Sequence, residues 1–140
     1  MKNLLLTIAL VLSVISAQAQ SVSFQLKEFY NFEIFSQLNP LEEYVNNREI
    51  PMGGGVGNVK ITFNETKNAV FVEDSTINQV MVYHITEKYQ PSSDYVRYTV
   101  QGPKGMFAYI VTKQPDGSVN VYTFWNEGMV TKGWASVAVK

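Results

Sequence analysis

The sequence predicts a mainly β protein with one short N-terminal helix. After this helix in the chain, an antiparallel meander of about seven strands forms a partly open barrel. Three observations support this fold. From Asn58 onward, apolar and polar residues alternate with a period of two, which is typical of half-buried strands. Turn-forming residues recur every eight to twelve positions or so, as they do in sheets built from hairpins. Several of these turns contain glycine, which allows the pairing of neighbouring strands to be derived.

Residues 1–19 have the features of a signal peptide and not of a folded element. Lys2 provides a positive start, Leu4–Ile15 is an uncharged apolar run, and residues 17–19 (Ala-Gln-Ala) have the small-x-small form of a cleavage site. The apolar run is too short to span a bilayer as a helix. We therefore expect cleavage after Ala19 and export to the periplasm or the medium, without a membrane-spanning segment.

The composition excludes several classes of protein. The formal net charge is −1, whereas binding to nucleic acid needs clustered lysine and arginine. The absence of cysteine excludes disulfides, thiolate metal sites and the cysteine anchor of a lipoprotein. The eight tyrosines, eight phenylalanines and two tryptophans supply the apolar area that a cysteine-free domain needs for its core.

Residues 20–140 are expected to form a single β-rich domain, with a lead-in over residues 20–57 and the meander over residues 58–140. Within the lead-in, Ser21–Phe35 is apolar without a clear period and fits a strand or a helix. A short helix is expected over about Pro40–Asn47, because its first residues match a capping box with proline at the first helical position.

The meander is divided into strands by its turns. Each expected strand is an alternating or β-branched segment bounded by glycine, proline, asparagine or aspartate. The expected strands are Asn58–Phe63, Ala69–Glu73, Gln79–Tyr89, Tyr95–Gln101, Met106–Lys113, Ser118–Trp125 and Met129–Val139.

Three loops set the alignment of neighbouring strands: Pro115–Gly117, Gly102–Gly105 and Asn126–Gly128. The first and the third end in glycine, as expected for three-residue hairpin loops with glycine in the left-handed position. The residues that these loops pair are Gln114 with Ser118, Gln101 with Met106, and Trp125 with Met129.

The three alignments agree on one apolar face of the sheet. A slip by one residue at any loop would scatter this set over both faces. The inward face is expected to carry Val96, Tyr98, Val100, Phe107, Tyr109, Val111, Val119, Val121, Trp125, Met129, Ala135, Val137 and Val139.

The opposite face mixes polar residues with apolar ones. Its apolar residues are Ile110, Tyr122, Phe124, Val130 and Trp134. The N-terminal segments can cover this strip, or the strip can bind a protein partner, since soluble monomers rarely leave a large apolar patch bare.

No catalytic, metal or cofactor site is predicted. His84 is the only histidine, so two imidazoles cannot share a metal. The face that His84 occupies depends on the Gln90–Asp94 loop. If Tyr89 pairs with Tyr95, His84 points inward. If Gln90 pairs with Tyr95, Tyr83 and Ile85 point inward instead. The glycine-rich Gly53–Gly57 lacks the spacing of a phosphate-binding loop.

Tyr98, Tyr109 and Trp125 are the candidate ligand-binding residues, because they share the inward face. In a nearly closed barrel they can line a cavity for an apolar or amphipathic small molecule, whereas in a filled sandwich they are only core. The meander with its preceding helix resembles small lipocalin-type half-barrels at the level of architecture, a resemblance that transfers no residues. The first functional hypothesis is therefore an exported, non-catalytic binding module, and the alternative is a protein-interaction or envelope-associated domain.

Overall fold

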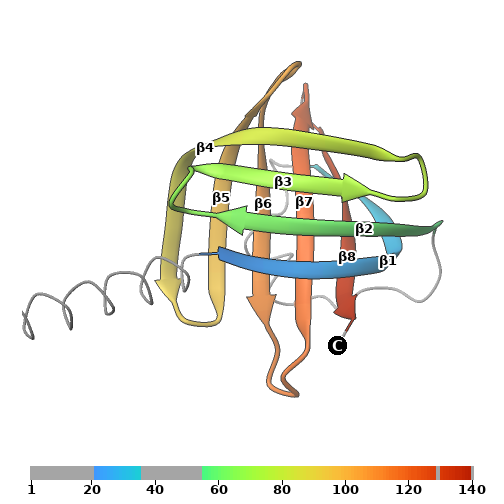
Figure 1. Ribbon diagram of the computed structural model, residues 1–140. Coiled ribbons are helices and arrows are strands. Elements are labelled where there is room, and N and C mark those ends of the chain that lie inside the picture. Colours follow the sequence, from blue (N-terminus) through green and yellow to red (C-terminus); the bar gives the residue numbers. More distant parts are fainter. Residues whose placement is uncertain (1–20, 36–54, 129, 140) are drawn as a thin grey trace, which may run out of the picture.

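The computed structural model describes residues 21–35, 55–128 and 130–139 (Figure 1). These residues form eight antiparallel strands in a closed barrel whose order follows the sequence, which confirms the mainly β, antiparallel, barrel-like prediction. The helix expected over about Pro40–Asn47 and the signal peptide expected over residues 1–19 both lie outside the described residues. The strands are β1 (Ser21–Phe35), β2 (Gly55–Asn64), β3 (Ala69–Asp74), β4 (Gln79–Ser92), β5 (Tyr95–Gly102), β6 (Gly105–Lys113), β7 (Val119–Glu127) and β8 (Val130–Val139).

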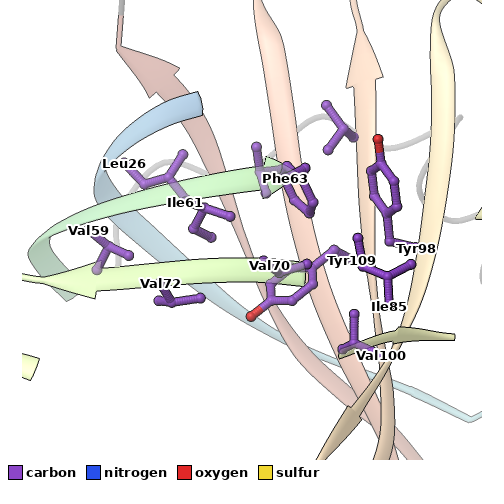
Figure 2. Close-up of a cluster of buried hydrophobic side chains, with 12 residues drawn as sticks. Leu26, Val59, Ile61, Phe63, Val70, Val72, Ile85, Tyr98, Val100 and Tyr109 are labelled. Carbon is purple, nitrogen blue, oxygen red and sulfur yellow. The ribbon is translucent and has the colours of Figure 1, made fainter. Parts of the chain in front are cut away.

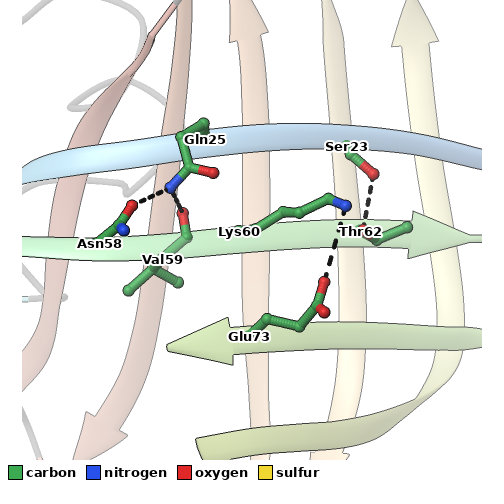
Figure 3. A network of polar contacts seen from close by, with 7 residues as sticks. All are labelled: Ser23, Gln25, Asn58, Val59, Lys60, Thr62 and Glu73. Carbon is green, nitrogen blue, oxygen red and sulfur yellow. Dashed lines mark hydrogen bonds and ion pairs between the residues drawn. The ribbon is translucent and has the colours of Figure 1, made fainter. Parts of the chain in front are cut away.

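In the closed barrel, β1–β4 cross in front of β5–β8 (Figure 1). The turns after β3, β5 and β7 lie at one end, which we call the open end, and the turns after β2, β4 and β6 lie at the other, the closed end. Polar side chains from β1, β2 and β3 contact one another on the outer face of these strands (Figure 3). Ser23 and Thr62 share a hydrogen bond of 2.7 Å there, and Lys60 lies 3.9 Å from Glu73.

β1 is the segment for which the sequence allowed a strand or a helix, and it closes the barrel as a strand. Its first half pairs with β2 and its second half with β8. A register shift between Leu26 and Glu28 separates the two halves. Because of this shift, the inward-facing residues Leu26 and Phe29 are three positions apart, whereas in a regular strand they would be two apart. For this reason the sequence of β1 shows no clean period of two.

Two of the three predicted hairpin alignments are confirmed. Gln101 pairs with Met106, and the β6–β7 pairing sets Val111 opposite Val121. The Gln114 amide donates a 2.8 Å hydrogen bond to the Ser118 carbonyl oxygen across the β6–β7 loop. Gly117 has a φ of 84° in that loop, which is the left-handed conformation that the sequence predicted for it.

The β4–β5 pairing fixes the face of His84, although Tyr95 pairs with Ser92 and with neither Tyr89 nor Gln90. Ile85 pairs with Val100, and register shifts follow on both sides of Tyr89. Tyr83 and Ile85 therefore face the core, and His84 lies exposed on the outer face.

The predicted alignment of the last hairpin is wrong. The sequence paired Trp125 with Met129, whereas in the structure Trp125 pairs with Lys132 and Glu127 with Val130. The physical reason is that the loop is shorter than predicted. Gly128, which has a left-handed φ of 63°, is the first residue of a two-residue loop, whereas the prediction made it the last residue of a three-residue loop. The register differs by an odd number of residues, so every β8 side chain changes face.

The change of face in β8 reverses which of its residues reach the core. Trp134 and Ala138 pack against the main hydrophobic cluster, and Ser136 is fully buried. Ala135, Val137 and Val139, which the sequence placed inside, lie on the outer side. Gly133 is also on that side, where a side chain would meet the Thr123 carbonyl oxygen.

Candidate functional site

A cavity of about 1020 Å³ occupies the open end of the barrel. All eight strands contribute residues to its lining, and exposed residues of the β3–β4 and β5–β6 turns form its rim. The inner end of the cavity is formed by buried side chains, among them Val59, Val72 and Tyr109. The cavity therefore lies inside the barrel and not between separate elements.

The barrel is filled at its closed end by large side chains (Figure 2). Phe63 is fully buried and its ring stacks on that of Tyr98, with centroids 4.7 Å apart. The Tyr98 hydroxyl donates a 2.9 Å hydrogen bond to Glu65, and the Glu65 carboxylate also forms an ion pair with the Lys88 ammonium at 2.6 Å. This packing blocks the closed end and confines the cavity to the other half.

The inward residues of β2 explain why one half is filled and the other hollow. From the open to the closed end they are Gly57, Val59, Ile61 and Phe63, so their size increases along the strand. A Cβ at Gly57 would come within 3.0 Å of the Phe29 ring. Glycine at this position therefore leaves room for an aromatic side chain in the cavity wall.

Aromatic side chains line the cavity on two walls. On one wall, the rings of Phe29 (β1) and Trp134 (β8) meet edge to face with centroids 5.0 Å apart. On another, Tyr83 (β4) meets Phe107 (β6) at 4.9 Å, and Phe107 meets Tyr109 at 5.5 Å. β4 and β8 lie on opposite sides of the closed strand order, so the two aromatic groups face the cavity from different sides.

The polar groups deep in the cavity are neutral hydroxyls. Tyr109 is 4% exposed, and its burial, together with the nearby Tyr83, raises its pKa well above the usual value, while a hydrogen bond with Thr123 acts in the opposite direction. The Thr123 hydroxyl donates to the Ala108 carbonyl oxygen at 3.2 Å. In Figure 2 the Tyr109 hydroxyl points toward the side of Val72, whereas that of Tyr98 points away from it.

Charged side chains lie at the rim. Among the lining residues that the structure describes, these are Asp74, Lys104 and Glu127. Asp74 accepts a 3.0 Å hydrogen bond from the Thr76 amide in the β3–β4 turn. Hydrogen bonds from Lys132 and then Trp125 lower the pKa of Glu127, which lies 2.9 Å from the Lys132 ammonium.

The structure brings two of the three predicted ligand-binding residues to the cavity. Tyr109 and Trp125 line it, with Tyr109 deep and Trp125 at the rim, where it is 37% exposed. Tyr98 shares their face, as predicted, but lies in the filled half. Sequence reasoning missed Phe29, because β1 has no clean period, and Trp134, because the last hairpin was misaligned.

The five residues predicted as a partner-binding strip do not share one exposed face. Ile110 and Tyr122 are on the outer side but are buried, with exposures of 0% and 2%, and Phe124 packs against them. Trp134 points into the barrel, and Val130 is partly buried. The strip is therefore corrected to a buried outer cluster formed by three of its five members.

Neither a metal-ligating cluster nor a membrane-spanning helix is found in the part of the chain that the structure describes. Within residues 21–35, 55–128 and 130–139, no three His, Asp or Glu side chains gather where a metal ion could be held. The same ranges contain no helix that is long and apolar enough to cross a membrane.

Comparison of the chain with protein-family models, with curated proteins and with solved structures finds no match.

Proposed function

We propose that this protein is an exported, non-catalytic binding module that holds an apolar or amphipathic small molecule inside the barrel. The observation that carries the proposal is the aromatic-lined cavity at the open end. Its volume of about 1020 Å³ is at the upper end of the range in which ligand pockets fall. Barrels of eight strands are also the size at which the interior can hold one small ligand. The apolar run Leu4–Ile15 and the cleavage motif after it support the exported location.

The lining distinguishes the cavity from a packing defect. Apolar space that is left empty destabilises a protein in proportion to its volume. Larger aliphatic residues at Val59 or Val72 would fill part of this space, yet the largest inward residues of β2 lie at the closed end. An interior that is filled at one end and hollow at the other supports selection for binding.

The alternative, a protein-interaction domain that uses the outer sheet face, has weaker support. Its expected strip includes Trp134, which faces the barrel interior, and Ile110 and Tyr122, which are buried. No continuous apolar surface made of these residues is left for a partner.

Tryptophan fluorescence tests the proposed function directly. The sequence contains two tryptophans, Trp125 and Trp134, and both line the cavity. Titration with N-phenylnaphthylamine, an uncharged fluorescent probe, should quench tryptophan emission and increase probe emission with one saturable curve. Absence of any saturable change in either signal would refute the proposal.

A pair of matched variants distinguishes the cavity from the outer surface. The double variant Val59→Phe/Val72→Phe adds two rings at the inner end of the cavity and should weaken probe binding by more than about fivefold. The control Val80→Phe/Val82→Phe adds the same rings on the outside of β4, where the valines are 67% and 58% exposed. The control should bind the probe like the unmodified protein.

A further inference from the structure

We infer that the ligand of this cavity is an uncharged, ring-containing molecule that enters with a hydrogen-bond-accepting oxygen leading. The inference rests on the proposed function and narrows it from apolar or amphipathic small molecules in general to one chemical class. Three features of the lining carry it: the distribution of charge, the two aromatic walls and the hydroxyl groups at the inner end.

The distribution of charge disfavours an anionic leading group. Lys104 is the only cationic side chain among the described lining residues, and it lies exposed in the β5–β6 turn at the rim. A carboxylate that reached Tyr109 would lose its hydration without gaining a cation as partner, which is costly in an apolar environment. A fatty acid that led with its carboxylate is therefore a poor fit.

The aromatic walls favour a ligand that contains rings. Phe29 and Trp134 approach from β1 and β8, and Tyr83 and Phe107 approach from β4 and β6. Aromatic pairs gain attraction beyond their buried area when they meet edge to face or offset, and a rigid ring loses little conformational entropy on binding. A flexible acyl chain of the same hydrophobicity gains less from these walls.

The hydroxyls at the inner end favour an oxygen that accepts hydrogen bonds. Tyr109 stays protonated, because its burial disfavours the phenolate. The Tyr83 hydroxyl donates to the Met81 sulfur at 3.1 Å, and a thioether is a weak acceptor that a ligand oxygen can replace. Both tyrosines line the cavity, so a carbonyl, ether or hydroxyl oxygen that enters first meets two phenolic hydroxyls, and it would take the place of the Met81 sulfur at Tyr83 and of Thr123 at Tyr109.

Isothermal titration calorimetry with four probes tests the inference. The probes are methyl phenanthryl ketone, phenanthrene carboxylate, methyl nonyl ketone and decanoate, chosen so that the two ketones partition similarly between octanol and water. Each ketone should bind about tenfold or more tighter than the carboxylate with the same body, because burial of the charge is uncompensated. The ring ketone should bind about two- to tenfold tighter than the chain ketone.

Two tyrosine variants locate the contact with the leading oxygen. Tyr109→Phe should weaken binding of methyl phenanthryl ketone by about threefold to tenfold while leaving that of phenanthrene itself unchanged. The matched control is Tyr98→Phe, which removes a hydroxyl from the filled half of the barrel, where it bonds Glu65. The thermal stability of the Tyr98→Phe variant should fall modestly, and the affinity of this variant for the ketone should equal that of the unmodified protein.

The outcomes separate this inference from the proposed function. If none of the four probes binds, the proposed function itself fails. If all four bind with equal affinity, or if the carboxylates bind more tightly and lose that advantage in Lys104→Gln, the cavity binds small molecules but the inferred class is wrong. Equal loss of ketone affinity in Tyr109→Phe and Tyr98→Phe would also overturn the inference.

Discussion

Replacement of Phe63 by alanine removes the side chain that blocks the closed end of the barrel. Phe63 is fully buried, stacks on Tyr98 at 4.7 Å and meets Tyr109 edge to face at 5.6 Å. Truncation of a buried phenylalanine costs about 3–5 kcal/mol, and the aromatic pairs place this site at the upper end of that range. For a domain of this length the loss corresponds to a fall in the melting temperature of about 10–20 °C.

Urea denaturation followed by circular dichroism measures this loss, with Trp125→Ala as the matched control. Trp125 faces inward, so sequence reasoning counts it as core, but it is 37% exposed at the rim and its truncation should cost about 1–2 kcal/mol. A free energy of unfolding that falls equally in both variants, or that changes by less than about 1 kcal/mol in Phe63→Ala, would refute the division of the barrel into a filled and a hollow half.

Three further predictions concern single contacts. Gly133→Ala should destabilise the protein strongly in the same denaturation assay, because the new Cβ would collide with the Thr123 carbonyl oxygen. Near-native stability would contradict the β7–β8 register. Lys132→Met should raise the pKa of Glu127 toward its ordinary value of 4.5 in an NMR titration of the carboxyl carbon, because it removes the hydrogen bond that lowers this pKa most. The stabilisation from the contact is complete above the ordinary value and is lost as the pH falls through the lowered folded-state pKa. An unchanged titration would show that the ion pair does not form in solution. Burial raises the pKa of Tyr109, so the stabilisation linked to its protonated form is complete below pH 10.0 and is lost as the pH rises above that value. The free energy of unfolding should therefore fall less steeply with alkaline pH in Tyr109→Phe than in the unmodified protein. Identical alkaline profiles for the two proteins would rule out this contribution.

Local turn chemistry was sufficient to predict much of the meander. The loops at Pro115–Gly117 and Gly102–Gly105 fix their strand pairs through residues that are close in sequence. The Asn126–Gly128 loop could not be resolved in this way, because a left-handed glycine fits a two-residue as well as a three-residue connection. That one ambiguity placed Trp134 on the wrong face.

The cavity itself depends on contacts that no local pattern encodes. Phe29 reaches the interior only because a register shift in β1 changes its face, and the barrel closes only because β1 pairs with both β2 and β8. Tyr98 and Tyr109 share the inward face and look equivalent in the sequence. Their separation into a filled and a hollow half follows from the increase in size along β2, which has meaning only once the barrel is closed.

The most direct test of the central claim is an NMR measurement of intermolecular nuclear Overhauser effects between isotope-labelled protein and bound N-phenylnaphthylamine. A probe held inside the open end should show contacts to the Trp134 indole and the Met81 methyl group, both of which line the cavity. It should show none to Val82, which lies on the outer face of the same strand as Met81. Contacts to Val82 in the absence of contacts to Trp134 would place binding on the outer surface and contradict the account.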